Sequence, residues 1–459
     1  MLQIIVSQLH PQPRHHVQKQ RTAVIPARIK NNMTKIKPFR AVVYNQDTVK
    51  GLAEVVCPPY DVISAQQQEK YRKMSKENFI HILLSKAADN EDKYRKAAEL
   101  FNEWQKKNIL IQEAQPAIYF YEQQYKVKGE KKTRVGFIAR LKLEENNSRV
   151  FAHENTRSEA KEDRLKLVKA VKANLSPIFA VFQDQKRIIP RTYKSLAAQS
   201  RPFIDIVDSE GVGHKLWRID SPELIKQITA SIDAEDVFIA DGHHRYEVGC
   251  AYRDLMKQKH SGSDGNEPFN YVLCYFTSDH ALGLTILPIH RLVKLPPKFD
   301  IELFKSRVKE FFDLEEVKDK SKFFFLMEKG GRSEHLIGFY KDKKYWLLRL
   351  KNIKTLEKMM PDRPAVYRWL DVSILNHLIL DTILGLGLDN KENVEFIQDP
   401  DELERRVDSS KSSVGFLLNP VKMQQIIDVA LAGSRMPPKS TYFYPKVLSG
   451  LVINRLDEE

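Results

Sequence analysis

The chain has 459 residues, 42% of them apolar and 29% charged, which suits a folded protein of two or three domains and excludes a wholly disordered one. No apolar run approaches the roughly 18 residues that cross a membrane, and the three cysteines lie far apart. We therefore predict a cytoplasmic protein without a disulfide framework or a membrane contact. The net charge of +14 suits anionic ligands, but it is spread along the chain, so nucleic acid is not expected as a partner.

Residues 1–32 form a basic leader with five cations and no acidic residue. Three prolines and the lack of periodicity predict that this leader is disordered. Its short apolar run precedes the basic residues, which is the reverse of the order in a signal peptide. Two interpretations stay open: the leader is a mitochondrial-type address, or the native chain begins at Met33 and does not contain it.

Residues 33–294 are predicted to form an N-terminal α+β domain, because helical and strand-like periodicities follow one another without a regular βαβ rhythm. Helices are expected at Ala65–Met74 (with Ser64 as its N-cap), Glu91–Lys107, Ser158–Ala173, Pro222–Ile232 and Tyr246–Lys257. Strands are expected at Ala41–Tyr44, Ala117–Val127, Thr133–Leu143, Ile178–Phe182, Val237–Ala240, Tyr271–Thr277 and Leu284–Pro288.

A Leu-Pro-Pro linker near Lys294–Pro297 predicts a domain boundary, followed by a second α+β domain over residues 295–459. Helices are expected here at Ile301–Phe312, Asp371–Leu384 and Pro420–Ala432, and a hairpin is expected at His335–Tyr340 and Lys344–Leu350. Gly385 is expected to end the second of these helices.

The sharpest local signal is the turn Asp241-Gly242-His243-His244-Arg245 between a buried strand and a helix. Gly242 lets the backbone approach a ligand closely, and the first N–H groups of a helix carry partial positive charge. Arg245 adds a bidentate donor for phosphate, while His243 or His244 can bond to the phosphate or move a proton. The turn therefore predicts a phosphate site; the alternative is a capped helix start whose histidines only pack.

A second group of polar residues precedes the helix predicted at Ser158–Ala173. Glu154 is a candidate general base and His153 a candidate acid or metal ligand, on a loop of the kind that often carries catalytic groups. Lys161 and Arg164 lie on the apolar side of the helix and either point at an anion or extend to water. The alternative is an exposed polar loop without a catalytic role.

Two further segments contain candidate ligands. Asp61 follows Pro58-Pro59 and either ligates Mg²⁺ or caps the next helix. Lys439, Ser440 and Thr441 offer a cation and two hydroxyls to an anion beside rigid prolines. The chain has no P-loop, dinucleotide-binding, zincin or serine-hydrolase motif.

Five ordered motifs follow the leader: Ile36–Arg40, Pro58–Ser64, His153–Thr156 with Lys161 and Asp163-Arg164, Asp241–Tyr246, and Met436–Thr441. Together they resemble an uncharacterised bacterial family, domain of unknown function 1015. The resemblance runs from about Lys35 to Val452, nearly the whole chain after the leader. It implies membership of a family whose activity is not established.

The turn Gly242–Arg245 and its helix also resemble, more remotely, the Gly-x-x-Arg phosphate-binding turn of the ParB and sulfiredoxin superfamily. This resemblance implies a nucleotide-binding core of that kind within the larger mixed chain. His243 stands where the sulfiredoxin turn has cysteine, so sulfiredoxin chemistry is not expected. The superfamily includes free-serine kinases, which implies a nucleotide and serine metabolism as the setting.

The leading hypothesis is a phosphotransferase that moves a phosphoryl group from ATP or ADP to a small metabolite, with free serine as the first candidate. Gly242–Arg245 and Lys439–Thr441 are predicted to bind the nucleotide phosphates, and Glu154 to take the proton of the acceptor hydroxyl. His153 and His244 are the other catalytic candidates.

Mg²⁺ is expected with the nucleotide, held by Asp61 or Asp241. One alternative is a metal-dependent phosphatase or hydrolase whose ligands are Asp241, His243, His244 and His153. The other alternative is a nucleotide-gated binding protein without catalysis.

Overall fold

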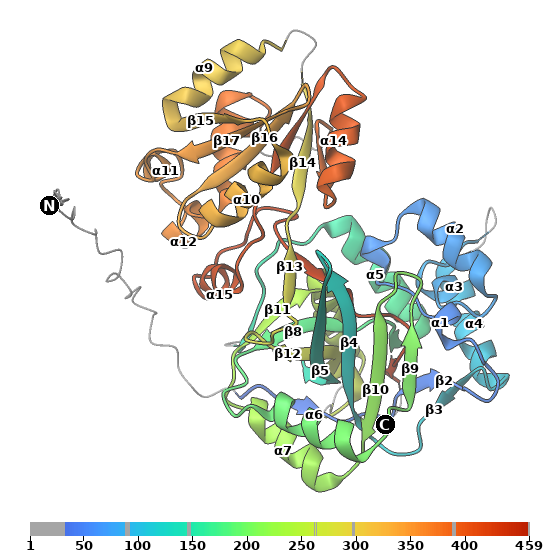
Figure 1. The fold of residues 1–459 in the computed structure, drawn as a ribbon. Helices are drawn as coiled ribbons and strands as arrows, with labels where there is room; N and C mark the ends of the chain where they lie inside the picture. The colour runs from blue at the N-terminus through green and yellow to red at the C-terminus, as the bar shows by residue number, and fades with distance from the viewer. Residues whose placement is uncertain are drawn as a thin grey trace, which may run out of the picture. The chain divides into compact units, whose positions relative to one another are not determined.

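Two large β-sheets with helices packed on them form the framework of the computed structural model (Figure 1). The structure describes residues 33–87, 92–144, 148–260, 262, 264–295, 299–387 and 392–457, so the predicted leader lies outside the described residues. Among the described residues, no helix combines the length and apolar character of a membrane span. Helices and mixed sheets together confirm the predicted α+β class.

The first sheet is mixed and has nine strands. In spatial order they are β6 (Val150–Phe151), β11 (Val237–Asp241), β8 (Ile178–Phe182), β12 (Tyr271–Ser278), β5 (Glu130–Lys142), β4 (Ile118–Val127), β10 (Gly213–Ile219) and β9 (Ile204–Val207), with β1 (Ile36–Lys37) on β5. The β6–β11 and β8–β12 pairs are parallel, and the other pairs are antiparallel. The strands predicted at Ala117–Val127 and Thr133–Leu143 form the antiparallel β4–β5 pair.

Both faces of this sheet are buried because its strands carry apolar side chains at odd and at even positions. In β4, Tyr119 and Tyr121 join the core on one face, and Ile118 and Phe120 join the core on the other. The helices α6 (Ile188–Gln199) and α7 (Pro222–Ile232) contribute to the second core, on one side of the sheet in Figure 1. The strand-like pattern of these segments made them predictable from the sequence.

Helices near the first sheet begin where their capping chemistry dictates. Ser64 caps α2 (Ala65–Met74) because its hydroxyl accepts a hydrogen bond from the Gln67 N–H, and the side-chain oxygen of Gln67 accepts one from the Ser64 N–H. The helix α8 (His243–Lys259) begins three residues before the predicted start, because Gly242 adopts φ +89° and turns the chain directly out of β11. The other helices here are α1 (Leu52–Val55), α3 (Ile80–Leu83), α4 (Lys93–Lys106) and α5 (Ser158–Val171).

The second sheet is antiparallel throughout and has six strands. Their order is β15 (Phe312–Val317), β17 (Lys344–Leu350), β16 (Leu336–Lys341), β19 (Ser413–Leu417), β14 (His290–Lys294) and β18 (Val394–Ile397). Helices α9 (Ile301–Phe311), α10 (Lys320–Gly330) and α14 (Pro400–Asp408) contact these strands. The predicted helix at Asp371–Leu384 begins as α13 (Asp371–Ile374) and continues as a π-helical stretch over Leu375–Ile383.

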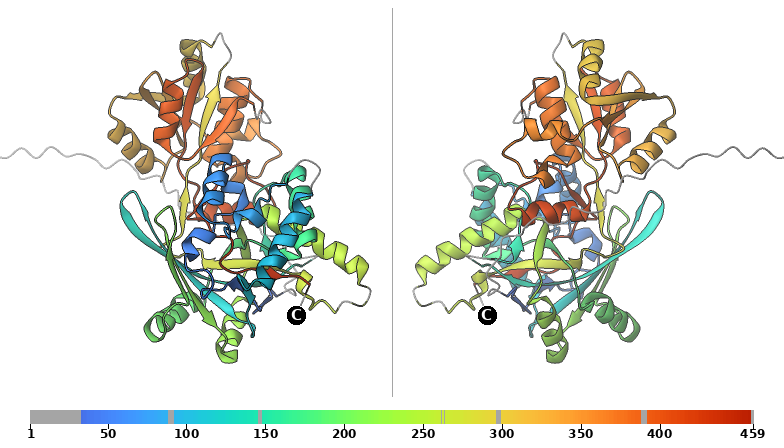
Figure 2. Two further views of the ribbon diagram at one scale, coloured as in Figure 1. Left: turned by 90° about the vertical axis from the view of Figure 1, so that its right-hand side faces the viewer. Right: turned by 90° about the vertical axis from the view of Figure 1, so that its left-hand side faces the viewer.

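The chain crosses between the two sheets more than once. Strand β14 precedes the boundary predicted at residue 295, yet it pairs within the second sheet. After α15 (Met423–Leu431), the chain returns to the first sheet's surroundings, where β20 (Tyr442–Tyr444) pairs with β13 (Thr285–Leu287), and β21 (Asn454–Arg455) pairs with β7 (Ala173–Asn174). Figure 2 shows this returning segment in red among the elements of the first sheet. Residues 32–459 accordingly form one compact unit.

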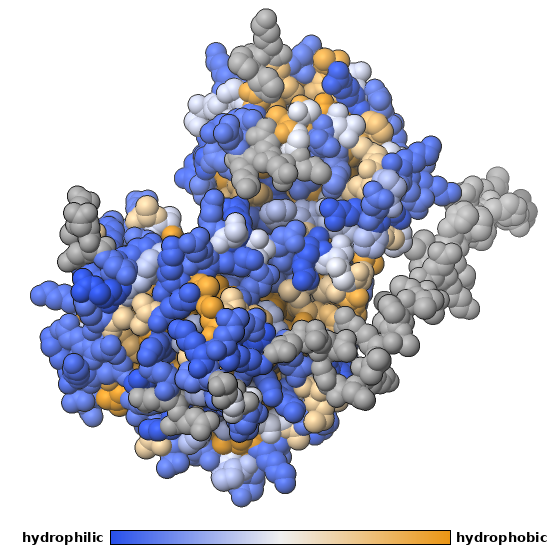
Figure 3. All heavy atoms as spheres, turned by 180° about the vertical axis from the view of Figure 1, so that it is seen from behind, coloured by the Kyte–Doolittle hydropathy of each residue, from blue (hydrophilic) through white to orange (hydrophobic). Residues whose placement is uncertain are grey.

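The exposed surface carries few large apolar side chains. Polar side chains predominate on the face shown in Figure 3, and the apolar ones form small groups. The most exposed large apolar residues of the described chain include Leu282, Phe325 and Val207, which lie on different elements. The returning C-terminal segment and the turn before α8 instead border an internal hollow, which is the candidate site.

Candidate functional site

A cavity of about 810 Å³ lies where segments distant in sequence meet. Its walls come from the segment before α2, the loop before α5, the β11–α8 turn, the β13–β14 connection, β18, and the chain after α15. Its volume falls within the range of about 300–1,000 Å³ that is typical of small-molecule sites. It brings together most of the residues predicted from the sequence, namely Asp61, Glu154, Asp241, Gly242, His243, His244, Arg245, Lys439 and Thr441.

The N-terminus of α8 opens on this cavity. Within the described residues, no side chain caps this 17-residue helix, and its first turn contains no acidic residue. Its first internal bond runs from the Tyr246 N–H to the Gly242 carbonyl at 3.0 Å. The preceding N–H groups of the first turn, beginning at His243, therefore remain for a ligand, and the helix dipole favours an anion there.

Arg245 folds back over the turn rather than extending freely into the cavity. Its Nη2 donates to Asp241 Oδ2 at 2.6 Å, and its Nη1 donates to the Pro177 carbonyl. A Cβ at position 242 would lie 2.9 Å from the guanidinium carbon, so glycine is needed for this packing as well as for its positive φ. The guanidinium thus fixes the turn, and its direct contact with a phosphate stays a prediction.

Asp241 lies between two cations. One carboxylate oxygen contacts Arg245 and the other contacts the Lys446 amine, which also lies 4.4 Å from the centre of the Tyr442 ring. Although burial opposes ionisation, Lys446 and then Arg245 bring the pKa of Asp241 well below its usual range. Sequence reasoning missed Lys446; the only signal was its place at the end of the basic, proline-rich run after Met436.

Glu154 also lines the cavity, and its surroundings differ from those of Asp241. Burial raises its pKa to about 7, with Lys439 opposing and Asp241 adding to the rise. Its Oε1 accepts a hydrogen bond from the Thr441 hydroxyl at 3.2 Å, and its Oε2 lies 3.8 Å from Nδ1 of His243. A carboxyl group that titrates near neutral pH can take or give a proton.

Two buried histidines, His153 and His243, lie near Glu154. His243 Nε2 accepts the backbone N–H of His153 at 3.3 Å, so in the neutral ring the hydrogen is on Nδ1, the atom nearest Glu154. His153 Nε2 lies 3.4 Å from the Thr441 hydroxyl that bonds to Glu154. Burial lowers the pKa of His153 to about 3 and that of His243 well below its usual range, so both rings are neutral. His153 itself does not line the cavity.

His244 lines the cavity from the first turn of α8. Its Nε2 accepts the backbone N–H of Arg157 at 3.0 Å, which places the hydrogen of the neutral ring on Nδ1. Burial lowers the pKa of His244 below its usual value. Because each imidazole of the turn already accepts a backbone N–H, His243 and His244 tie the turn to the loop that carries Glu154.

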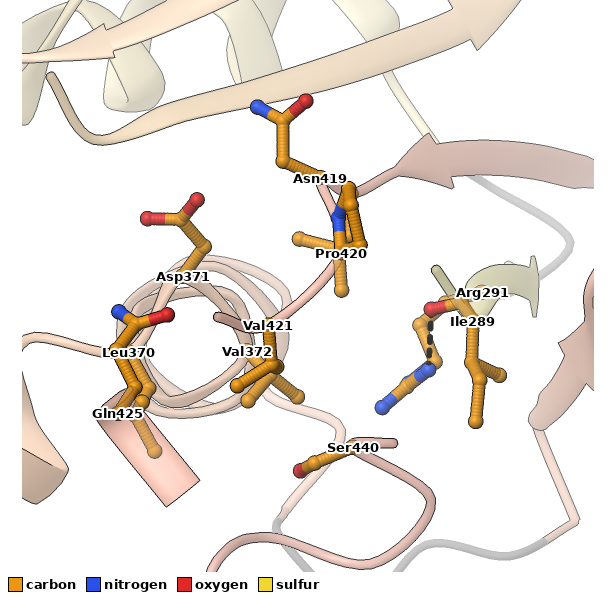
Figure 4. Close-up of a pocket in the computed structure, with 11 residues that line it drawn as sticks. Ile289, Arg291, Leu370, Asp371, Val372, Asn419, Pro420, Val421, Gln425 and Ser440 are labelled. Atoms are coloured by element: carbon orange, nitrogen blue, oxygen red, sulfur yellow. Dashed lines mark hydrogen bonds between the residues drawn. The ribbon is translucent and has the colours of Figure 1, made fainter. Parts of the chain in front are cut away.

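The chain after α15 supplies three predicted residues, which the structure places differently. Lys439 is exposed at the cavity, and Thr441 bonds to Glu154. Ser440 is buried, its hydroxyl donates to the Pro437 carbonyl at 2.5 Å, and it lines another cavity of about 20 Å³ (Figure 4). In that cavity, the buried Arg291 holds the loop by donating to the Lys439 carbonyl at 3.0 Å.

The two cations predicted on α5 do not line the main cavity. Lys161 pairs with Glu247 at 3.0 Å, on the same carboxylate oxygen that accepts from Thr156. Arg164 is buried, donates to the Leu83 carbonyl at 2.8 Å, and lies 4.5 Å from the centre of the Tyr60 ring. Both cations therefore serve contacts between elements.

The carboxylates fit a cation only in part. Asp61 is exposed at the cavity, and because Ser64 caps α2, Asp61 is not needed as the cap. Mg²⁺ in nucleotide sites usually takes one or two carboxylates together with phosphate oxygens, and Asp61 fits that pattern. Asp241 fits less well because both of its oxygens contact cations. In the described part of the chain, no group of three or more His, Cys, Asp or Glu residues is arranged to hold a metal.

Comparisons with known proteins agree with the motifs. The model of the family described as "protein of unknown function (DUF1015)" matches residues 36–373, and no curated protein matches the chain. Among solved structures, a free serine kinase mutant in complex with ADP is similar at 12% identity and a TM-score of 0.31, covering 64% of this chain and 84% of its own. C-terminally truncated SbnI from Staphylococcus aureus is similar at 12% identity and a TM-score of 0.34, covering 68% and 85%. A conserved hypothetical protein from Pyrococcus furiosus is similar at 12% identity and a TM-score of 0.30, covering 65% and 89%.

Proposed function

The chain belongs to the DUF1015 family, whose function is unknown, and from the geometry of its cavity we propose that it transfers a phosphoryl group from a nucleotide to the hydroxyl of a small metabolite. The observation that carries the proposal is the meeting, in one cavity, of an uncapped helix N-terminus and a carboxyl group that titrates near pH 7. The first feature suits phosphate, and the second suits proton transfer from an alcohol.

The phosphates of ATP or ADP bind at the first turn of α8, where free N–H groups and the dipole favour negative charge. Lys439 adds an exposed cation from the facing loop. Arg245 and Lys446 keep Asp241 ionised and the turn rigid, so the donors stay in place while the phosphoryl group moves. Positioning and charge neutralisation account for most of the catalysis in this class of reaction.

Glu154 accepts the proton as the acceptor oxygen forms its bond to phosphorus and the bond to the leaving phosphate oxygen breaks. The Thr441 hydroxyl holds Oε1 by a hydrogen bond, and Nδ1 of His243 lies 3.8 Å from Oε2. Mg²⁺ supplies further neutralisation of the phosphates when it is bound with the nucleotide, and Asp61 is the carboxylate that we propose to hold it. Free serine is the acceptor to test first, on the basis of the remote resemblance of the α8 turn.

The test incubates the full chain with ATP or ADP, Mg²⁺ and serine, and follows the phosphorylated product by ³¹P NMR. We expect product from the wild type, and we expect Glu154→Gln to lower kcat at least about 100-fold because general bases contribute about 10²–10⁴. Nucleotide binding, measured by thermal shift, should be kept; saturation at about 100 times Kd adds roughly 2.7 kcal/mol of stability.

The matched control is Glu162→Gln, because Glu162 is a carboxylate on the exposed face of α5 that pairs with Lys166 at 2.8 Å. This variant should match the wild type. A Glu154→Gln enzyme with full turnover would remove the proposed base. Nucleotide binding without turnover on serine or on a panel of other hydroxyl metabolites would instead support the nucleotide-gated binding protein, and the absence of any nucleotide response would overturn the proposal.

A further inference from the structure

One part of the cavity wall is apolar and contains an exposed aromatic ring. Phe396, on β18, is 40% exposed, although most large apolar side chains of the second sheet are buried. Leu287, the last residue of β13, and Ile289, from the β13–β14 connection, line the same cavity. An exposed phenyl ring in a concave site offers a face on which a planar ligand can stack.

The orientation of the Phe396 ring is fixed from one side. Phe396 and Arg291 are opposite each other in the β14–β18 pair, and the guanidinium carbon of Arg291 lies 4.5 Å from the centre of the ring. Arg291 is almost fully buried and donates to the Ile289 carbonyl at 2.7 Å. The guanidinium therefore covers one side of the ring, and the exposed remainder belongs to the cavity wall.

A polar group with both a donor and an acceptor stands beside the ring. Gln398 follows Phe396 by two positions, and both line the cavity, whereas Ile397 between them is buried in the core of the second sheet. Gln398 directly follows β18, which ends at Ile397. The amide of Gln398 can pair with the donor and acceptor edge of a heterocycle, as glutamine does with adenine.

Arg291 connects Phe396 to the loop that carries Lys439. The guanidinium that stacks on Phe396 also donates to the backbone carbonyl of Lys439 at 3.0 Å. Lys439 in turn faces the cavity near the α8 turn and acts on the pKa values of Glu154 and His244. One cavity thus has an anion-binding part and an aromatic part on a continuous wall.

We propose that the Phe396 wall is a base subsite: the heterocycle of the nucleotide stacks on Phe396, and Gln398 hydrogen-bonds its edge. The inference rests on the proposed phosphate site at α8 and deepens it by naming the part of the ligand that the second sheet binds. Phe396 lies on β18 and Gln398 directly follows that strand, so the second sheet carries the subsite.

The test measures binding of ADP and of pyrophosphate to the full chain by isothermal titration calorimetry, with ATP and tripolyphosphate in parallel. The wild type should bind ADP about tenfold more tightly than pyrophosphate, because stacking on an aromatic side chain contributes this order of affinity. Phe396→Ala should lower the affinity for ADP about tenfold and leave that for pyrophosphate unchanged, whereas Phe396→Trp should keep ADP binding.

The matched control is Phe325→Ala, because Phe325 is also an exposed phenylalanine with a nearby cation, Lys329, and it does not line the cavity. It should bind both ligands as the wild type does. Equal affinity of the wild type for ADP and pyrophosphate, or equal losses of both in Phe396→Ala, would overturn the base subsite and leave the phosphate site intact. If the wild type binds none of the four ligands, the proposed function itself is overturned.

Discussion

Two carboxylates that line the cavity, Asp241 and Glu154, lie on different walls and experience opposite electrostatics. At the β11–α8 turn, Asp241 contacts Arg245 and Lys446, and its pKa is held far down. On the loop before α5, Glu154 has a hydroxyl and a neutral imidazole close to its oxygens, and burial raises its pKa to about 7. The first carboxylate is therefore a permanent charge, and the second is able to exchange a proton.

Asp241 and Glu154 are both carboxylates, and the difference between their pKa values is what gives them different roles. When neighbouring carboxyl groups have their pKa values pushed apart, the environment assigns the roles. Asp241 organises two cations next to the helix N-terminus, so that they support the turn instead of repelling each other. Glu154 is the residue that we propose to carry the proton, and the two histidines near it stay neutral because they are buried.

The largest effect is expected from removing the permanent charge. Asp241→Asn leaves Lys446 and Arg245 without their shared anion, so we expect the free energy of unfolding to fall by about 3–5 kcal/mol. Chemical denaturation of the full chain at pH 7 measures this. Asp236→Asn is the control at the other end of β11, because Asp236 directly precedes this strand, is 40% exposed and pairs with Arg149 at 2.9 Å. It should cost at most about 1 kcal/mol; equal losses in the two variants would contradict the comparison.

The second prediction concerns the pH dependence of stability at Glu154. Its folded pKa of about 7 lies above its ordinary value of 4.5, so the stability it contributes is present below pH 4.5 and is lost as the pH rises through 7. Glu154→Gln should therefore match the wild type near pH 4 and exceed it above pH 7. The expected gain is about 2 kcal/mol, after allowance for the exposed part of the side chain.

Denaturation curves of both proteins at pH 4.5, 6 and 8 measure this difference. Glu162→Gln serves again as the control, and its difference from the wild type should stay small across the range. A Glu154→Gln protein that is less stable than the wild type at pH 8 would show that the carboxyl group is not penalised by its burial. If Glu154→Gln loses activity and gains stability, Glu154 is present for its chemistry and not for the stability of the fold.

Much of the fold follows from local patterns in the sequence. The residues of β4 and β5 alternate clearly, and Ser64 and Pro222 mark helix starts that the structure places at the predicted residues. The short strands β14, β18 and β19 of the second sheet were not predicted, because their register depends on partners far away in the chain. The return of the C-terminal segment to β13 and β7 has no local signal.

The candidate site was predictable as residue types and not as contacts. The turn at Gly242 announced a helix N-terminus, and Glu154 was identified as a base because of its position on a loop. The sequence did not indicate that Lys446 would compete for Asp241, or that Phe396 would be exposed in the same cavity. Those facts depend on the second sheet and on the chain after α15, which approach the turn only in three dimensions.

The smallest effect is expected from Lys439, an exposed cation that lines the same cavity as Asp241 and Glu154. Lys439→Met should weaken pyrophosphate binding about fivefold at low salt, and the difference should shrink as salt is added, because an exposed charge is screened. Lys126→Met, an exposed lysine on β4 outside the cavity, is the control. Lys439 also lowers the pKa of Glu154, so the same variant should move the rise of the pH–rate profile to higher pH. If Lys439→Met binds pyrophosphate more weakly but keeps the pH–rate profile of the wild type, Lys439 acts on the phosphates alone. The pKa of Glu154 would then depend on Asp241 and not on Lys439.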